Sequence, residues 1–118
     1  MAYNEYLQER IERIFTERKA PFFGKKMMGG YVFMVDEKMC VGLLVDKKTN
    51  EDLLMARIGE EAMEEAFTKT GCAPMDFTGR PMKGFVFVKP EGFDMDEDLE
   101  YWIDLALDFN PKAKKSKK

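Results

Sequence analysis

Histidine is missing from this 118-residue chain. Histidine is the side chain that most often transfers protons near neutral pH, and it completes Ser-His-Asp and Cys-His catalytic sets and many zinc sites. The chain also lacks the spacing of a P-loop or of a dinucleotide-binding fingerprint. These absences argue against an ordinary acid–base enzyme, so we expect no catalytic residues, no metal and no cofactor.

Cysteine is scarce, since Cys40 and Cys72 are the only two and form no C-x-x-C pair. Neither a thiolate metal site nor a redox pair is indicated. We expect two buried thiols and a reducing cytoplasmic setting, although the sequence is also compatible with one disulfide between them. Cys72 is the one plausible nucleophile, but the acidic helix before it disfavours its thiolate.

Long hydrophobic runs are absent too. No run approaches the roughly 18 apolar residues of a membrane span, and the first ten residues contain no apolar core of a signal peptide. With 45% hydrophobic and 35% charged residues, the composition is that of a folded protein. We therefore expect one cytoplasmic domain over residues 1–110, without a membrane partner.

Charge is unevenly distributed along the chain, although the net charge is only −3. Residues 1–48 carry nine basic and seven acidic groups, whereas residues 49–110 carry five basic and fifteen acidic groups. Residues 111–118 read as a disordered tail, which is either merely solvated or makes weak contact with nucleic acid. Its lysines are Lys112, Lys114, Lys115, Lys117 and Lys118.

The apolar periodicity predicts three helices and four clear strands. The helices are expected at 3–18, 60–71 and 94–109, and the strands at 31–35, 38–46, 53–58 and 82–89. Two helices have an apolar stripe, formed by Tyr3, Leu7, Ile11, Ile14 and Phe15 in the first and by Leu99, Trp102, Ile103, Ala106, Leu107 and Phe109 in the last. Gly71 is expected to stop the middle helix.

The order α-β-β-β-α-β-α lacks regular βαβ alternation, which predicts an α+β fold with an antiparallel sheet of about four to five strands. Several strands are apolar on both faces, so either helices cover both sides or one side meets another subunit. Asp36-Glu37 separates two strands, but Glu disfavours positive φ. A longer loop or a bulge is therefore expected there.

A first candidate anion-binding segment contains Lys25, Lys26, Gly29 and Gly30 at the entrance of a strand. Successive glycines can turn backbone N–H groups toward an anion, and the lysines would add charge. The alternative, which we favour, is a bulge or a close approach where only glycine fits.

A second candidate lies in the turn-rich stretch before the last strand. Arg80 could present its guanidinium to a phosphate or carboxylate, although an internal tie to Asp76 is the simpler interpretation. If these cations converge on one anion, the site would consist of five residues, which are Lys25, Lys26, Arg57, Arg80 and Lys83.

Methionine is frequent, with ten residues. Thioethers could serve an adaptable binding surface or copper ligation, but core filling is the simpler role. The acidic residues at 94–100 fail the calcium-loop pattern and are read as a solvated helix start.

The runs KKMMGGYVFMVDEKMCVGLLVD, LLMARIG and PMDFTGRPMKGFVFV together resemble the N-terminal domain of the TfoX/Sxy family, over roughly residues 10–109. Met28 stands where the family's opening motif usually has Phe. The resemblance implies an α+β fold and an auxiliary role in transcription linked to competence, exercised through a partner. It covers only the first half of the full-length regulators, so we expect a stand-alone domain without their C-terminal half.

Together these observations predict a non-enzymatic regulatory or interaction domain. Its expected partner is a transcription factor or a second copy of the chain, with only weak nucleic-acid contact through the tail. The alternative is a small domain that binds an anionic ligand or a nucleotide, and an enzyme is the least favoured class.

Overall fold

The computed structural model describes residues 4–27, 30–46, 49–74 and 84–112. The elements, in chain order, are α1 (Glu5–Glu17), β1 (Phe22–Met27), β2 (Gly30–Val35), β3 (Lys38–Val45), β4 (Asp52–Arg57), α2 (Glu60–Ala66), β5 (Cys72–Pro74), β6 (Phe85–Val88), the 3-10 turn η1 (Pro90–Gly92), α3 (Asp96–Phe109) and the 3-10 turn η2 (Asn110–Lys112).

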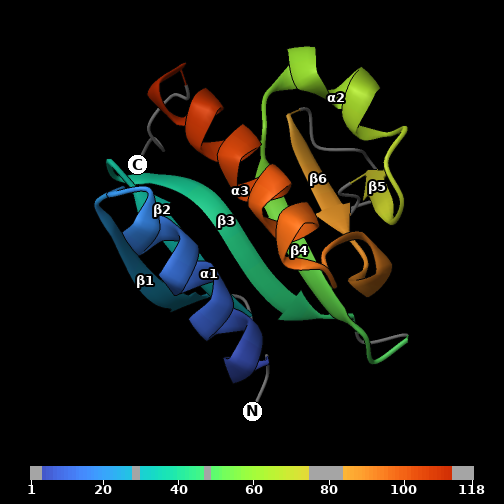
Figure 1. Cartoon of the computed structure of the whole chain (residues 1–118), viewed down its shortest axis with the longest axis horizontal. Helices are drawn as coiled ribbons and strands as arrows, with labels where there is room; N and C mark the ends of the chain where they lie inside the picture. The colour runs from blue at the N-terminus through green and yellow to red at the C-terminus, as the bar shows by residue number, and fades with distance from the viewer. Residues whose placement is uncertain (1–3, 28–29, 47–48, 75–83, 113–118) are drawn as a thin grey trace.

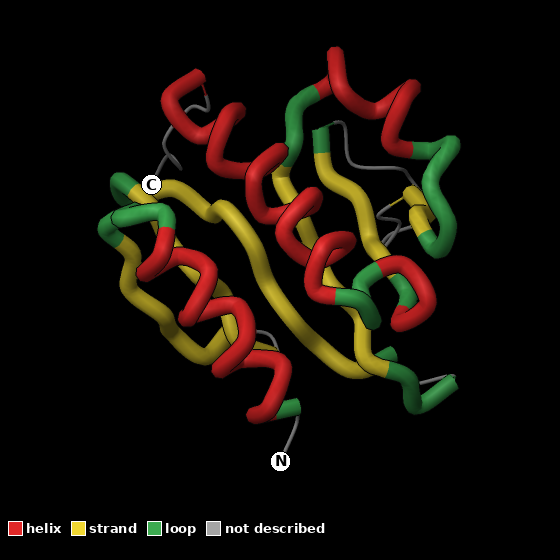
Figure 2. Tube along the Cα trace, viewed as in Figure 1, coloured by secondary structure: helices red, strands yellow, loops and turns green. Residues whose placement is uncertain are grey.

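One antiparallel sheet holds the six strands of the described residues, in the order β1-β2-β3-β4-β6-β5. Helices α1 and α3 lie side by side across one face of this sheet, as Figure 1 shows. The α+β class and the antiparallel sheet are thus confirmed. The expected four to five strands are corrected to six, because β1 and β5 add one strand at each edge (Figure 2).

Asn4 is the N-cap of helix α1, and its side-chain oxygen accepts hydrogen bonds from the backbone N–H groups of Tyr6 and Leu7. This cap satisfies donors that a helix start leaves unpaired. The predicted apolar stripe is confirmed, since Leu7, Ile11, Ile14 and Phe15 are all buried. Tyr3 lies outside the described residues.

Helix α3 begins with three acidic residues, which suit the positive end of the helix dipole. Its predicted core residues Leu99, Trp102, Ile103 and Ala106 are buried. The indole Nε1 of Trp102 donates a 2.9 Å hydrogen bond to the Gly92 carbonyl. At the end of the stripe, Leu107 is half-buried but packs against the core as predicted, whereas Phe109 is half-buried and is not part of the core cluster.

The core lies between the sheet and α1 and α3, and an aromatic cluster closes it beside β1. Phe15 stacks on Phe22 at a centroid distance of 5.2 Å, and Phe33 packs against both rings. The opposite sheet face is also apolar: Val32, Met34, Leu53 and Met55 are buried there. Helices α1 and α3 lie on the same face of the sheet. The alternative in which helices cover both faces is therefore not found among the described residues.

The β2–β3 turn is tighter than expected. Val35 pairs with Lys38, which leaves only Asp36 and Glu37 as loop, and both adopt positive φ (54° and 65°). This is the backbone of a type I′ turn, so the prediction of a longer loop is wrong. A bulge is present farther from the turn, where the register shifts at Cys40. The twist of the paired strands outweighs the side-chain preference of Glu.

Helix α2 is shorter than predicted. It ends at Ala66 with Phe67 as its C-cap, so Gly71 does not stop it. Gly71 instead has a φ of +81° and packs against the η1 backbone, just before β5. In β6 the predicted alternation is confirmed, since Val86 and Val88 are buried while Phe85 and Phe87 are half-buried.

A buried polar contact joins the C-terminal end of α3 to the β2–β3 turn. Lys38, only 5% exposed, donates from Nζ to the Asn110 carbonyl at 2.8 Å and pairs with Asp36 at 3.4 Å. The Asn110 side chain donates to the Val35 carbonyl at 3.1 Å. The η2 turn contains Pro111 and Lys112, which were assigned to the tail; residues 113–118 lie outside the described residues, so the disordered tail stays a prediction.

Candidate functional site

Of the cationic residues predicted to converge, the three that the structure describes occupy separate places in the sheet. Lys25 and Lys26 are exposed neighbours on β1, so their side chains point to opposite faces. Arg57 ends β4, which β2 and β3 separate from β1, a distance of about 14 Å across three strand spacings. Arg80 and Lys83, with Asp76, lie outside the described residues.

Gly30 is a position of close backbone approach rather than part of an anion cradle. A Cβ atom there would collide with the Leu43 carbonyl oxygen of β3. Gly30 is also buried and paired with Met27. This agrees with the favoured interpretation of the glycine segment, whereas Gly29 falls outside the described residues.

A pocket of about 560 Å³ opens where β4 leads into α2, beside the C-terminal end of α3. Two glycines with positive φ, Gly59 and Gly84, shape its floor, and Ile58 and Gly59 both donate backbone hydrogen bonds to the Gly84 carbonyl. A Cβ on Gly59 would come within 2.5 Å of the Phe109 ring. Glycine at position 59 therefore leaves room for the Phe109 ring, which forms part of the pocket wall.

The Arg57 guanidinium lies over two aromatic rings of this pocket. Its guanidinium carbon lies 5.2 Å from the Phe85 centroid and 6.0 Å from the Phe109 centroid. Such contacts fix the guanidinium plane and leave its N–H edge available. In the described part of the chain, Arg57 makes no ion pair and donates no side-chain hydrogen bond, although it is only half-buried.

The pocket brings together two cations, Arg57 and Lys112, that were predicted to belong to different sites. Lys112, assigned to the tail, lines it together with Arg57, and three carboxylates also line it. These acids are Glu60, Glu61 and Asp108, and all three are exposed. The lining therefore carries two positive and three negative groups.

Both thiols are poor nucleophiles in this fold. Burial raises the pKa of Cys40 to about 12, with the charge of Arg57 acting in the opposite direction, and burial raises the pKa of Cys72 to about 11. The weak Cys72 thiolate was expected, but its cause is desolvation rather than the acidic helix. Both cysteines are free, and the three strand spacings between β3 and β5, about 14 Å, are too wide for a disulfide.

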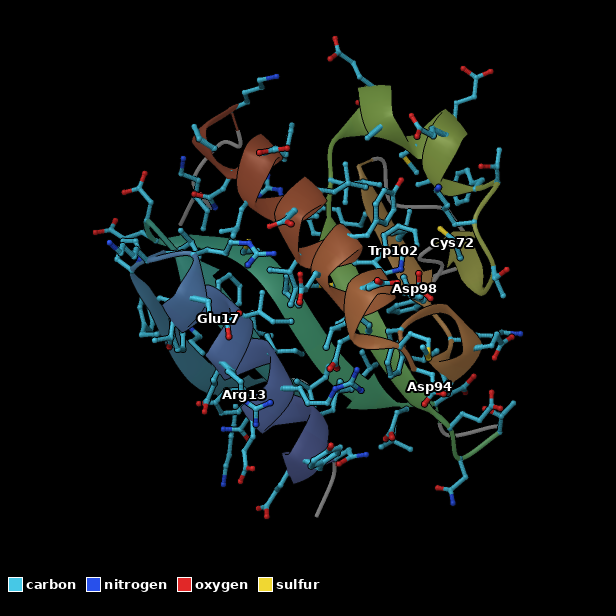
Figure 3. All side chains as sticks on the ribbon, viewed as in Figure 1. Arg13, Glu17, Cys72, Asp94, Asp98 and Trp102 are labelled. Atoms are coloured by element: carbon cyan, nitrogen blue, oxygen red, sulfur yellow. The ribbon has the colours of Figure 1, made fainter. Side chains whose placement is uncertain are left out.

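The acidic residues around the start of α3 divide into paired and solvated groups. Asp96 pairs with Arg10 at 3.0 Å, and Arg18, the C-cap of α1, binds Asp104 at 2.8 Å and Glu100 at 3.1 Å. Asp94 and Asp98 are exposed at this end of the helix (Figure 3). Among the described residues, no cluster of three or more Cys, Asp or Glu side chains could hold a metal ion.

None of the helices in the described ranges has the length and apolar character needed to cross a membrane.

The aromatic part of the pocket could not be predicted from the sequence pattern. Phe85 was assigned only to a strand face and Phe109 to the core, and both patterns are compatible with many environments. What joins them to Arg57 is the register, which pairs Arg57 directly with Phe85, and the length of α3.

Comparison with known proteins gives one family. Searches of curated proteins and of solved structures returned no significant match. The family model described as TfoX N-terminal domain matches residues 17–110, which include the whole sheet, α2, α3 and Arg57. The chain thus belongs to the TfoX N-terminal domain family.

Proposed function

We propose that this chain is a non-catalytic regulatory domain that acts in the cytoplasm by binding a protein partner, and that Arg57 holds a carboxylate of that partner. Membership in the TfoX N-terminal domain family supports a domain of this kind, and the link to competence gene expression, which the sequence resemblance implies, is part of the proposal. The partner is a transcription factor or a second copy of the chain, and nucleic acid is at most a weak contact of the lysine tail.

The observation that carries this proposal is the position of the Arg57 guanidinium over the Phe85 and Phe109 rings. Arginine recognises carboxylates through two parallel N–H bonds, and a guanidinium already fixed by Phe85 and Phe109 loses little freedom on binding. The surrounding wall, with Leu105 beside the two rings, suits an apolar neighbour of the bound carboxylate. An acidic residue flanked by an apolar one fits this combination.

The charge of the lining favours a single carboxylate over a polyphosphate. Lys112 adds a second positive group, but Glu60, Glu61 and Asp108 repel further negative charge. DNA and nucleoside triphosphates would bring several negative charges into contact with these acids. The pocket is therefore better suited to a protein side chain or chain terminus.

A second candidate function is the binding of a free small anion. The volume of about 560 Å³ supports it, because it lies within the common range for small-molecule sites. Calorimetry with a small dicarboxylate and with a nucleoside diphosphate separates the two candidates. Tight binding of either would favour the small-ligand function over the protein partner.

The proposal is tested by affinity capture from a lysate of the host cell with quantitative mass spectrometry. We expect a defined partner to be retained by the wild-type chain, lost with Arg57→Ala, and kept with the control Lys89→Ala. Lys89 is exposed and follows the far end of β6. Retention of the same proteins by Arg57→Ala, or of none by the wild type, would overturn the proposal.

A further inference from the structure

In the described part of the chain, β1 is a long edge strand with one side unpaired. Among the residues that the structure describes, its six residues pair only with β2, over the full register from Phe22–Val35 to Met27–Gly30. Figure 1 shows β1 at the outer edge of the sheet, on the side away from α3. The opposite edge is β5, which has only three residues and ends at Pro74. Of the two edges, β1 is thus the one long enough to accept another strand.

The β1 edge is held in place from the side of α1. Phe22 belongs to the aromatic cluster with Phe15 and Phe33, and the Tyr31 ring lies across Gly24, where a Cβ would collide with it. An edge fixed in this way does not need to become ordered when a partner strand arrives, so the cost of binding is reduced.

Each face of β1 presents one aromatic and one cationic side chain. Residues alternate along a strand, so Phe23 and Lys25 share one face while Phe22 and Lys26 share the other. Phe23 is 53% exposed, and both lysines are exposed. Any strand added to this edge therefore meets positive charge at one end and aromatic surface at the other, on both faces.

We infer that the β1 edge binds an extended acidic segment of a protein partner as an additional antiparallel strand. Antiparallel pairing, the more stable arrangement, places two acidic residues opposite Lys25 and Lys26 and two apolar residues opposite Phe22 and Phe23. The preferred segment then runs, from its N-terminus, acidic-acidic-any-apolar-apolar. This surface is separate from the Arg57 pocket and goes beyond the function proposed for it.

Charge decides between this partner and a second copy of the chain. Lysine on an edge strand discourages pairing with another positive strand, and a second β1 would bring two more lysines to the seam. A negatively charged strand neutralises the same two lysines. The β1 edge is thus expected to pair with an acidic segment rather than with β1 of a second copy.

The test uses the amidated probe peptide acetyl-Ser-Glu-Glu-Thr-Val-Val-Ser and the full chain, with binding measured by fluorescence anisotropy and located by amide NMR shifts. We expect shifts at residues 22–27 and binding that weakens as salt is raised. The double variant Lys25→Glu/Lys26→Glu should bind about tenfold more weakly, because two attractive pairs become repulsive. The peptide with Lys-Lys in place of Glu-Glu should bind that variant and not the wild type.

Two control experiments separate strand pairing at β1 from other modes of binding. A probe N-methylated at alternate residues loses the N–H groups on one edge and should not bind, since main-chain pairing carries the interaction. Arg57→Ala should bind the probe as the wild type does, so failure here is distinguishable from failure of the pocket. Equal binding of the N-methylated probe, an unaffected double variant, or a dimer paired through β1 would each overturn the inference.

Discussion

Lys38 shows how a charged side chain can be part of the packing of this fold. Its Nζ is buried and donates to the carbonyl of Asn110 at the C-terminal end of α3, where a positive charge is favourable. Replacing it with methionine keeps most of the volume but leaves that carbonyl without its donor.

We therefore predict that Lys38→Met lowers the free energy of unfolding by about 1–3 kcal/mol, the usual cost of a buried unsatisfied group. Urea denaturation measures this value. The matched control Lys89→Met alters an exposed lysine and should stay within about 0.5 kcal/mol of the wild type. A Lys38→Met chain as stable as the control would show that the buried contact contributes nothing.

Cys40 predicts a specific dependence of stability on pH. Its pKa is raised from 9.0 to about 12 in the folded chain by burial, so the folded state keeps the proton longer than the unfolded state. The stabilising contribution is complete below about pH 9 and is lost as the pH rises toward 12. Between pH 8 and pH 10, the wild type should lose about 1 kcal/mol more than Cys40→Ala.

The measurement is urea denaturation of both proteins at the two pH values, because comparing the two losses removes the titration of other groups. Equal pH losses for the two proteins would contradict the burial of Cys40.

Cys72 allows a chemical test at pH 8, where its pKa of about 11 leaves a roughly 100-fold smaller thiolate fraction than an ordinary thiol has. Alkylation of Cys72 in the native chain should therefore be slower than alkylation of Cys72 in the urea-unfolded chain, by a similar factor.

At the scale of elements, an ion-pair cluster joins α1 to α3. Arg18 binds both Glu100 and Asp104 on α3, and these hydrogen bonds raise its pKa above the ordinary arginine value. The three side chains are partly exposed, so solvent and salt weaken the interaction. The cluster therefore positions the two helices more than it stabilises the chain.

We predict that Arg18→Met lowers the free energy of unfolding by about 0.5–1 kcal/mol at low salt and by roughly half as much at 0.5 M salt. Arg13→Met is the matched control, since Arg13 is exposed on α1 and makes no ion pair within the described ranges. The expected change for this control is close to zero at both salt concentrations. A loss for Arg18→Met that is independent of salt would point to packing instead of charge.

The elements that the sequence predicts well are those with a strong apolar period. The stripes of α1 and α3 and the alternation of β6 are visible because burial selects one face of each element. β1 was missed because Lys25, Lys26 and Gly24 interrupt its apolar character, as is usual in an edge strand. β5 is too short, at three residues, to show any period.

At the scale of the whole molecule, the pocket depends on contacts between segments far apart in the chain. Arg57, Phe85 and Phe109 come from β4, β6 and α3, and no local pattern links them. Arg57 was a candidate only because it is a cation. The distribution of charge was more informative, since the acidic second half of the chain supplies Glu60, Glu61 and Asp108 to the same pocket.

The central claim is that Arg57 recognises a partner through the geometry of its guanidinium. The most direct test is the affinity of the captured partner for the wild type and for Arg57→Lys, measured by isothermal titration calorimetry. Lysine keeps the charge but cannot form two parallel N–H bonds or the same aromatic stacking, so we predict affinity weaker by about tenfold or more. Equal affinities, with both chains folded, would contradict the account.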